Sequence, residues 1–239
     1  MGVGICAMGA WARAGYWEGM VERSEADNSL VIHFKNLRKA IGFIGVALPF
    51  VLILGNQLVQ ASGLLGSISS YYHSVMRDIF VGSLCAVGTF LISYRGYDKR
   101  DNRAGWVAGT SVIGVALCPT TMEGGPGSSS LLGALHLAFA AVYFATLAYF
   151  SLVLFRETKD KATRTTQKRR RDVVYAICGS VMVLCLLLIV LVFLLPENSE
   201  IRQHHPVLWL ESAAILAFGI SWFTKGEWLF PDPSHAARA

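Results

Sequence analysis

Long apolar runs alternate along the chain with short polar or basic segments. The runs fall at residues 41–60, 72–94, 105–118, 131–155, 173–195 and 206–223. Several of them approach or exceed the roughly 20 residues that a helix needs to cross the hydrocarbon core of a bilayer. Because backbone groups in a bilayer must find their partners within the protein, such runs predict transmembrane helices. The pattern therefore predicts an all-α, polytopic bundle of six transmembrane helices.

The predicted bundle occupies residues 41–225 and leaves two flanking segments. Residues 1–40 are expected to form an N-terminal lead that ends in an interfacial stretch, because apolar residues alternate with lysine and arginine over 30–40. The same stretch could instead form the first turns of the first helix. Residues 226–239 are expected to form a polar C-terminal tail that contains proline. Three glycines, Gly42, Gly105 and Gly109, predict close contacts between helices.

The second apolar run begins next to a polar stretch. Its purely apolar part, residues 79–94, would cover roughly 24 Å at about 1.5 Å per residue, less than a hydrocarbon core of about 30 Å. A crossing helix would therefore begin near Tyr72, which places His73, Arg77 and Asp78 at membrane depth or just beneath the headgroups. Ionisable groups are costly at that depth, so they mark a candidate functional site.

Composition supports this assignment. The chain is 54% hydrophobic and 15% charged, whereas soluble domains carry about 25% charged residues. Soluble enzyme folds are therefore excluded. The five cysteines are scattered and form no CxxC pair, which predicts reduced thiols rather than disulfides or a cysteine-ligated metal.

Positive charge is concentrated at one set of helix ends. The other set has only Arg77 and Arg202. The positive-inside rule then places both termini in the cytoplasm and predicts a multi-pass protein of the bacterial inner membrane. We interpret the basic segment 156–172 as a topology signal, with anionic lipid headgroups as possible ligands and no nucleic-acid role. Membrane lipids are the expected partners.

Ionisable residues from three predicted helices converge on the opposite, outer side. His73 and Asp78 open the second helix, His136 opens the fourth and Glu211 opens the sixth. Imidazole and carboxylate groups are zinc ligands, so His73, His136 and Glu211 form a candidate three-ligand set. Asp78 could then act on the metal-bound water. Ser69 lies four residues before His73, so on a helix it would share a face with that histidine and could orient it or support an oxyanion.

Each of these residues also has a purely structural interpretation. Either histidine could hydrogen-bond to a neighbouring carbonyl. Asp78 could stabilise the start of its helix through the helix dipole. Glu211 could do the same, or it could pair with Arg77.

The outer-side motif resembles that of a membrane hydrolase superfamily, which includes alkaline ceramidases, progestin and adiponectin receptors and Per1-like proteins. Their signature is Ser-x3-His at the end of one helix, an Asp opening the next and His-x3-His opening the last. Ser69 and His73 match, and Asp78 follows at a short distance. In the last helix Glu211 stands where a histidine is wanted, so His136 would supply the missing ligand. The chain also resembles uncharacterised bacterial six-helix membrane proteins.

The resemblance implies a zinc-dependent amidase or esterase that acts on a lipid near the extracytoplasmic leaflet. The alternative is a non-enzymatic protein that binds a lipid or small molecule, or a proton-coupled carrier, because intramembrane carboxylates and histidines also form proton relays. A lipid hydrolase predicts an apolar opening with the polar cluster at its end. A carrier predicts a path through both leaflets.

Overall fold

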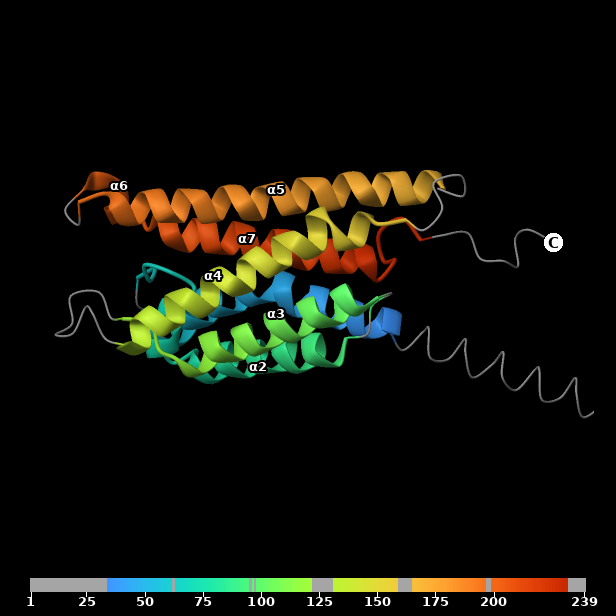
Figure 1. The fold of residues 1–239 in the computed structure, drawn as a ribbon. Helices are drawn as coiled ribbons and strands as arrows, with labels where there is room; N and C mark the ends of the chain where they lie inside the picture. The colour runs from blue at the N-terminus through green and yellow to red at the C-terminus, as the bar shows by residue number, and fades with distance from the viewer. Residues whose placement is uncertain are drawn as a thin grey trace, which may run out of the picture.

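The computed structural model describes residues 34–61, 63–94, 96, 98–121, 131–158, 165–196 and 199–231. In these ranges every regular element is a helix (Figure 1). The first helix is Phe34–Gln60, which we call the N-terminal helix. It is followed by η1 (Ser69–His73), α2 (Arg77–Ser93), α3 (Lys99–Leu117), α4 (Leu131–Leu152), η2 (Leu154–Arg156), α5 (Thr166–Leu194), α6 (Glu200–Gln203) and α7 (Pro206–Lys225). The all-α prediction is confirmed.

Four helices are long and apolar enough to cross a membrane. They are Phe34–Gln60, Leu131–Arg156, Thr166–Leu194 and Pro206–Lys225. With 17 residues, α2 covers about 26 Å, and α3 has several charged residues in its first turns. The structure is therefore that of a multi-pass membrane protein, while six spans and cytoplasmic termini stay predictions.

Successive long helices run in alternating directions (Figure 1). In the packing order, α2 contacts α3, α3 contacts α4, α4 contacts α5, and α5 contacts α7. One end of the bundle holds 34–39, 94, 96, 98–103, 165–172 and 225–231, and we call it the basic end. The opposite end holds η1, the start of α4 and the start of α7, and we call it the polar end. In Figure 1 the polar end is on the left and the basic end on the right.

Glycines allow two pairs of helices to touch through their backbones. A Cβ added to Gly109 of α3 would lie 2.6 Å from the carbonyl oxygen of Gly88 in α2, and one added to Gly105 would lie 2.6 Å from that of Leu91. A Cβ added to Gly42 would lie 2.9 Å from the carbonyl oxygen of Gly219 in α7. The close contacts predicted at Gly42, Gly105 and Gly109 are therefore present.

The predicted start of the second helix, near Tyr72, is wrong. The α-helix begins at Arg77, and residues 69–73 form a separate 3₁₀ turn. Ser74 separates the two because its backbone is extended and its hydroxyl donates to the carbonyl of Tyr71 while accepting from the N–H of Met76. A serine that bonds its local backbone competes with helix formation. At three residues per turn, Ser69 and His73 also no longer share one face.

Three other boundaries move at the basic end. The N-terminal helix begins at Phe34, so the described part of the interfacial stretch forms its first turns. The helices α3 and α5 begin at Lys99 and Thr166, inside the basic segments that precede the predicted apolar helices. The Asp98 carboxylate accepts from the N–H groups of Arg100 and Asp101, and the Asp101 carboxylate accepts from the N–H of Asp98, which completes a capping box for α3. Thr165 similarly accepts from the N–H of Lys168. These caps start the helices before the apolar runs do. Residues 1–33 and 232–239 of the predicted flanks lie outside the described residues.

Candidate functional site at the polar end of the bundle

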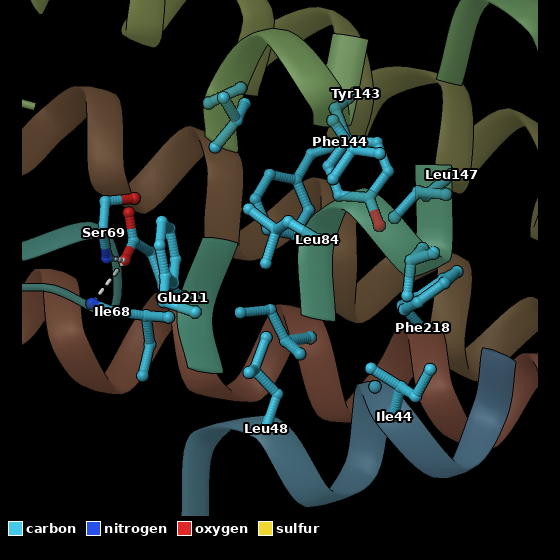
Figure 2. Close-up of a pocket in the computed structure, with 17 residues that line it drawn as sticks. Ile44, Leu48, Ile68, Ser69, Leu84, Tyr143, Phe144, Leu147, Glu211 and Phe218 are labelled. Atoms are coloured by element: carbon cyan, nitrogen blue, oxygen red, sulfur yellow. Dashed lines mark hydrogen bonds between the residues drawn. The ribbon is translucent and has the colours of Figure 1, made fainter. Parts of the chain in front are cut away.

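Glu211 connects α7 to the 3₁₀ turn η1. Its Oε2 atom accepts hydrogen bonds from the backbone N–H groups of Ile68 (2.7 Å) and Ser69 (3.2 Å). The side chain of Ser69 also hydrogen-bonds to this carboxylate. Figure 2 shows the carboxylate of Glu211 turned toward Ser69 and Ile68. Because one side-chain oxygen accepts from two backbone N–H groups, this contact fixes η1 against α7.

Both candidate histidines donate to the segment that follows α3. Nδ1 of His136 lies 2.7 Å from the carbonyl oxygen of Cys118, and Nε2 of His73 lies 2.7 Å from that of Thr120. A carbonyl only accepts, so these two nitrogens carry hydrogen. His136 is 2% exposed, whereas His73 lies at the surface. Each histidine thus makes the carbonyl contact that the structural interpretation of the sequence predicts.

Asp78 and Arg77 lie apart from this contact. Asp78 is exposed in the first turn of α2, where the helix dipole favours a carboxylate. Arg77 donates through Nη2 to the hydroxyl of Tyr72 at 2.9 Å, and its guanidinium carbon lies 4.7 Å from the centre of that ring. The structure therefore pairs Arg77 with Tyr72 and Glu211 with η1.

The predicted residues divide into two groups. Ser69 and Glu211 touch each other, while His73 and His136 are within electrostatic reach of each other and hold the segment after α3. Among the described residues, no group of three or more His, Cys, Asp or Glu side chains is placed to hold a metal ion. As they lie, His73, His136 and Glu211 do not fit a zinc ion as one ligand set. The zinc site and the role of Asp78 on its water stay predictions, and we derive no chemistry through a metal.

An apolar cavity of about 50 Å³ extends from Glu211 into the bundle. It lies between the N-terminal helix, α2, α3, α4 and α7. Figure 2 shows Tyr143 and Phe144 of α4 on one side and Ile44 and Leu48 on the other. Ser69 and Glu211 are its polar residues at one end, and the hydroxyl of Tyr143 points into it.

Sequence reasoning missed Tyr143 and the backbone of Ile68. Tyr143 is 8% exposed and lies in the middle of an otherwise apolar helix. A phenol in the middle of a membrane span is a detectable signal, because a buried tyrosine hydroxyl needs a polar partner. The role of Ile68 depends on backbone geometry and leaves no signal in the side chain.

No protein-family model, curated protein or solved structure matches this chain. The resemblance to membrane hydrolases therefore stays a prediction, and the geometry of the polar end carries the functional argument.

Proposed function

We propose that this chain is a membrane protein that binds a small, largely apolar molecule inside its helix bundle. The ligand would carry one hydrogen-bond donor, such as a hydroxyl, amide or amine. The single observation that supports this proposal is the cavity with apolar walls that ends at Glu211 and Ser69. Pockets of this composition, apolar with a few convergent polar groups, are the usual form of small-molecule sites.

The size of the cavity limits the ligand. A buried water needs at least about 10–15 Å³, so 50 Å³ has room for roughly three to five groups of that size. Burying about 100 Å² of apolar ligand surface would contribute about 2.5 kcal/mol. A hydrogen bond to a charged acceptor would add about 1.5–3 kcal/mol. Together these terms amount to about 4–5.5 kcal/mol before the entropic cost of association is subtracted, so the Kd is no tighter than roughly 0.1 mM.

The polar end selects for a donor. In its ionised form, the Glu211 carboxyl group has about four acceptor positions. The contacts with Ile68 and Ser69 use three of those on Glu211. One acceptor position is left for a ligand donor, and the hydroxyl of Tyr143 supplies a second polar contact within the cavity.

The proposal is tested by photolabelling in lipid nanodiscs with a short-chain alcohol that carries a diazirine. Peptide mapping by mass spectrometry should place the label on cavity residues of α4. Ala140→Leu fills the cavity and should abolish that label, while Ala141→Leu, on the exposed neighbouring position, should preserve it. Glu211→Gln should reduce the preference for the alcohol over the matching alkane probe. Equal labelling in both alanine variants would contradict the proposal.

Metal analysis separates this proposal from the zinc-dependent hydrolase. A zinc site would require His73 and His136 to release the carbonyls of Thr120 and Cys118 and to converge with Glu211. Stoichiometric zinc in the purified protein, lost on His73→Ala and on His136→Ala, would favour the hydrolase.

A further inference from the structure

Four basic side chains gather at the basic end of the bundle, where several helices meet. Lys225 ends α7, Lys168 and Arg171 lie in the first turns of α5, and Arg38 lies near the start of the N-terminal helix. Lys225 is close enough to interact electrostatically with each of the other three. We call these four residues the basic cluster. It lies at the opposite end of the molecule from the candidate site around Glu211.

The basic cluster rests on a layer of aromatic rings. The layer consists of four side chains, each at most 2% exposed: Tyr94, Phe155, Tyr175 and Trp222. Ring centres of Trp222 and its neighbours Tyr94 and Phe155 are 5.3 and 5.4 Å apart. The guanidinium carbon of Arg38 lies 5.4 Å from the centre of the Tyr94 ring, and Nζ of Lys225 lies 4.9 Å from that of Phe155. These cation–π contacts hold the positive charges in place and shield part of each from water.

Carboxylates lie against part of the basic cluster. Two carboxylates lie against it, those of Asp101 and Asp172, which are 5% and 4% exposed. Asp172 accepts from Lys168 at 2.6 Å, and Asp101 interacts electrostatically with Lys225. Arg171 donates to the backbone carbonyl of Phe230 at 3.0 Å. It is only 7% exposed, so its positive charge is partly shielded from the solvent that would otherwise screen it.

One donor in the cluster lacks an acceptor. The Nε atom of Arg38 is buried and makes no hydrogen bond within the part of the chain that the structure describes. A buried donor without an acceptor is costly, more so on a charged group. An oxyanion would supply both the acceptor and the negative charge. Phosphate fits this need best, because it carries up to two negative charges and several acceptor oxygens, which arginine and lysine bind well.

We propose that the basic cluster binds a phosphate group, carried by an anionic lipid headgroup or by a soluble phosphate. Basic pockets between transmembrane helices on the cytoplasmic side are a general form of lipid-headgroup site. The positive-inside rule predicts that this end faces the cytoplasm. The site is independent of the cavity at the polar end, so either proposal can fail without the other.

The test measures the Tm of the full-length protein in neutral detergent. Phosphatidic acid, phosphatidylcholine or inorganic phosphate is titrated into the wild type and three variants. Arg38→Gln and Lys225→Gln each remove one charge of the cluster, and Arg103→Gln removes an exposed charge at the same end of the bundle as the matched control. Gel filtration confirms that each variant is folded before titration.

We expect phosphatidic acid to raise the Tm of the wild type and of Arg103→Gln, and phosphatidylcholine to leave both unchanged. Arg38→Gln and Lys225→Gln should need at least roughly tenfold more phosphatidic acid for the same shift, the loss expected for one charge-assisted contact. If inorganic phosphate reproduces the shift, the natural ligand is soluble. If only phosphatidic acid acts, the ligand is a lipid. Equal responses to the two lipids, or an unchanged response in both cluster variants, would overturn the proposal.

Discussion

Replacing Glu211 tests whether its carboxylate holds the polar end together. Both N–H groups, those of Ile68 and Ser69, donate to the same oxygen atom, Oε2. Ile68 is 1% exposed, so its N–H has no access to water if the carboxylate is removed. Each unsatisfied buried donor costs about 1–3 kcal/mol, so Glu211→Leu should lower the free energy of unfolding by about 2–6 kcal/mol. At about 2–4 °C per kcal/mol for a chain of this size, the Tm should fall by about 4–24 °C.

Glu211→Gln is the matched control. An amide oxygen has two lone pairs, so the glutamine oxygen can accept from both N–H groups as Oε2 does. At a pH where Glu211 is ionised, the variant loses the charge, which weakens each bond by about 1 kcal/mol, but it also removes the cost of keeping a carboxylate away from water. Its Tm should therefore fall by less than half as much as that of Glu211→Leu. The assay is thermal unfolding in detergent, followed by intrinsic fluorescence. A leucine variant within about 2 °C of the wild type, or as stable as the glutamine variant, would refute this role of Glu211.

Two further predictions concern the packing of α2 on α3 and the start of α3. Gly109→Ala should destabilise the protein by about 1–3 kcal/mol, because the new Cβ would meet backbone atoms of Gly88 and Ile92 at 2.6 and 3.0 Å. Gly82→Ala, with open space around it, should be neutral or stabilising. Thermal unfolding that ranks the two variants in the opposite order would contradict this packing. A hydrogen bond from the backbone N–H of Asp101, with further bonds from Arg100, lowers the pKa of Asp98. Its contribution to stability is therefore fully present above the unfolded-state pKa of about 4 and is lost as pH falls through the lower folded-state pKa. Asp98→Asn keeps the N-cap, so the difference in Tm between wild type and this variant should shrink on acidification; a difference that is constant with pH would argue against the capping contact.

The sequence predicts helices best where a local signal marks their ends. α4 begins at Leu131 and α7 at Pro206, as predicted, because proline is favoured in the first turn and the preceding segments are polar. The prediction of helix ends is wrong at Ser74, where a hydroxyl hydrogen-bonds to the local backbone, and at Asp98, where an N-cap begins a helix among charged residues. Both errors come from hydrogen bonds over two or three residues, which an apolar-run pattern does not record.

For the candidate site, too, the sequence predicts some features and misses others. Alternating helix direction is enough to bring Ser69, His73, His136 and Glu211 to one end of the bundle. Which of them touch is decided by the 3₁₀ geometry of η1, which turns Ser69 toward Glu211 and His73 toward Thr120. Contacts of this kind depend on backbone angles, so the sequence predicts the location of the cluster and not its partners.

The short helices α2 and α3 explain why so many ionisable groups collect at the polar end. Because α2 begins and α3 ends short of the ends of their longer neighbours, the described parts of 61–76 outside the 3₁₀ turn η1, together with 118–121, are non-helical backbone next to the bundle. In a bilayer such backbone is tolerated only where the protein supplies its hydrogen-bond partners. Glu211 supplies the acceptor for two N–H groups of the first segment, and His73 and His136 supply donors for two carbonyls of the second.

The hydrogen bonds of Glu211, His73 and His136 also indicate which of these residues can bind a ligand. His136 and His73 each spend a ring N–H on a carbonyl, whereas Glu211 concentrates both of its backbone contacts on a single oxygen. A carboxylate bonded mainly through one oxygen keeps acceptor capacity on the other. Glu211 is also the acidic residue that lines the apolar cavity. A ligand at this end would therefore be recognised by Glu211 while the histidines keep the adjoining backbone in place. If His136→Phe and Glu211→Gln were equally to abolish the preference for the alcohol probe, without either losing its fold, this division of roles would be wrong.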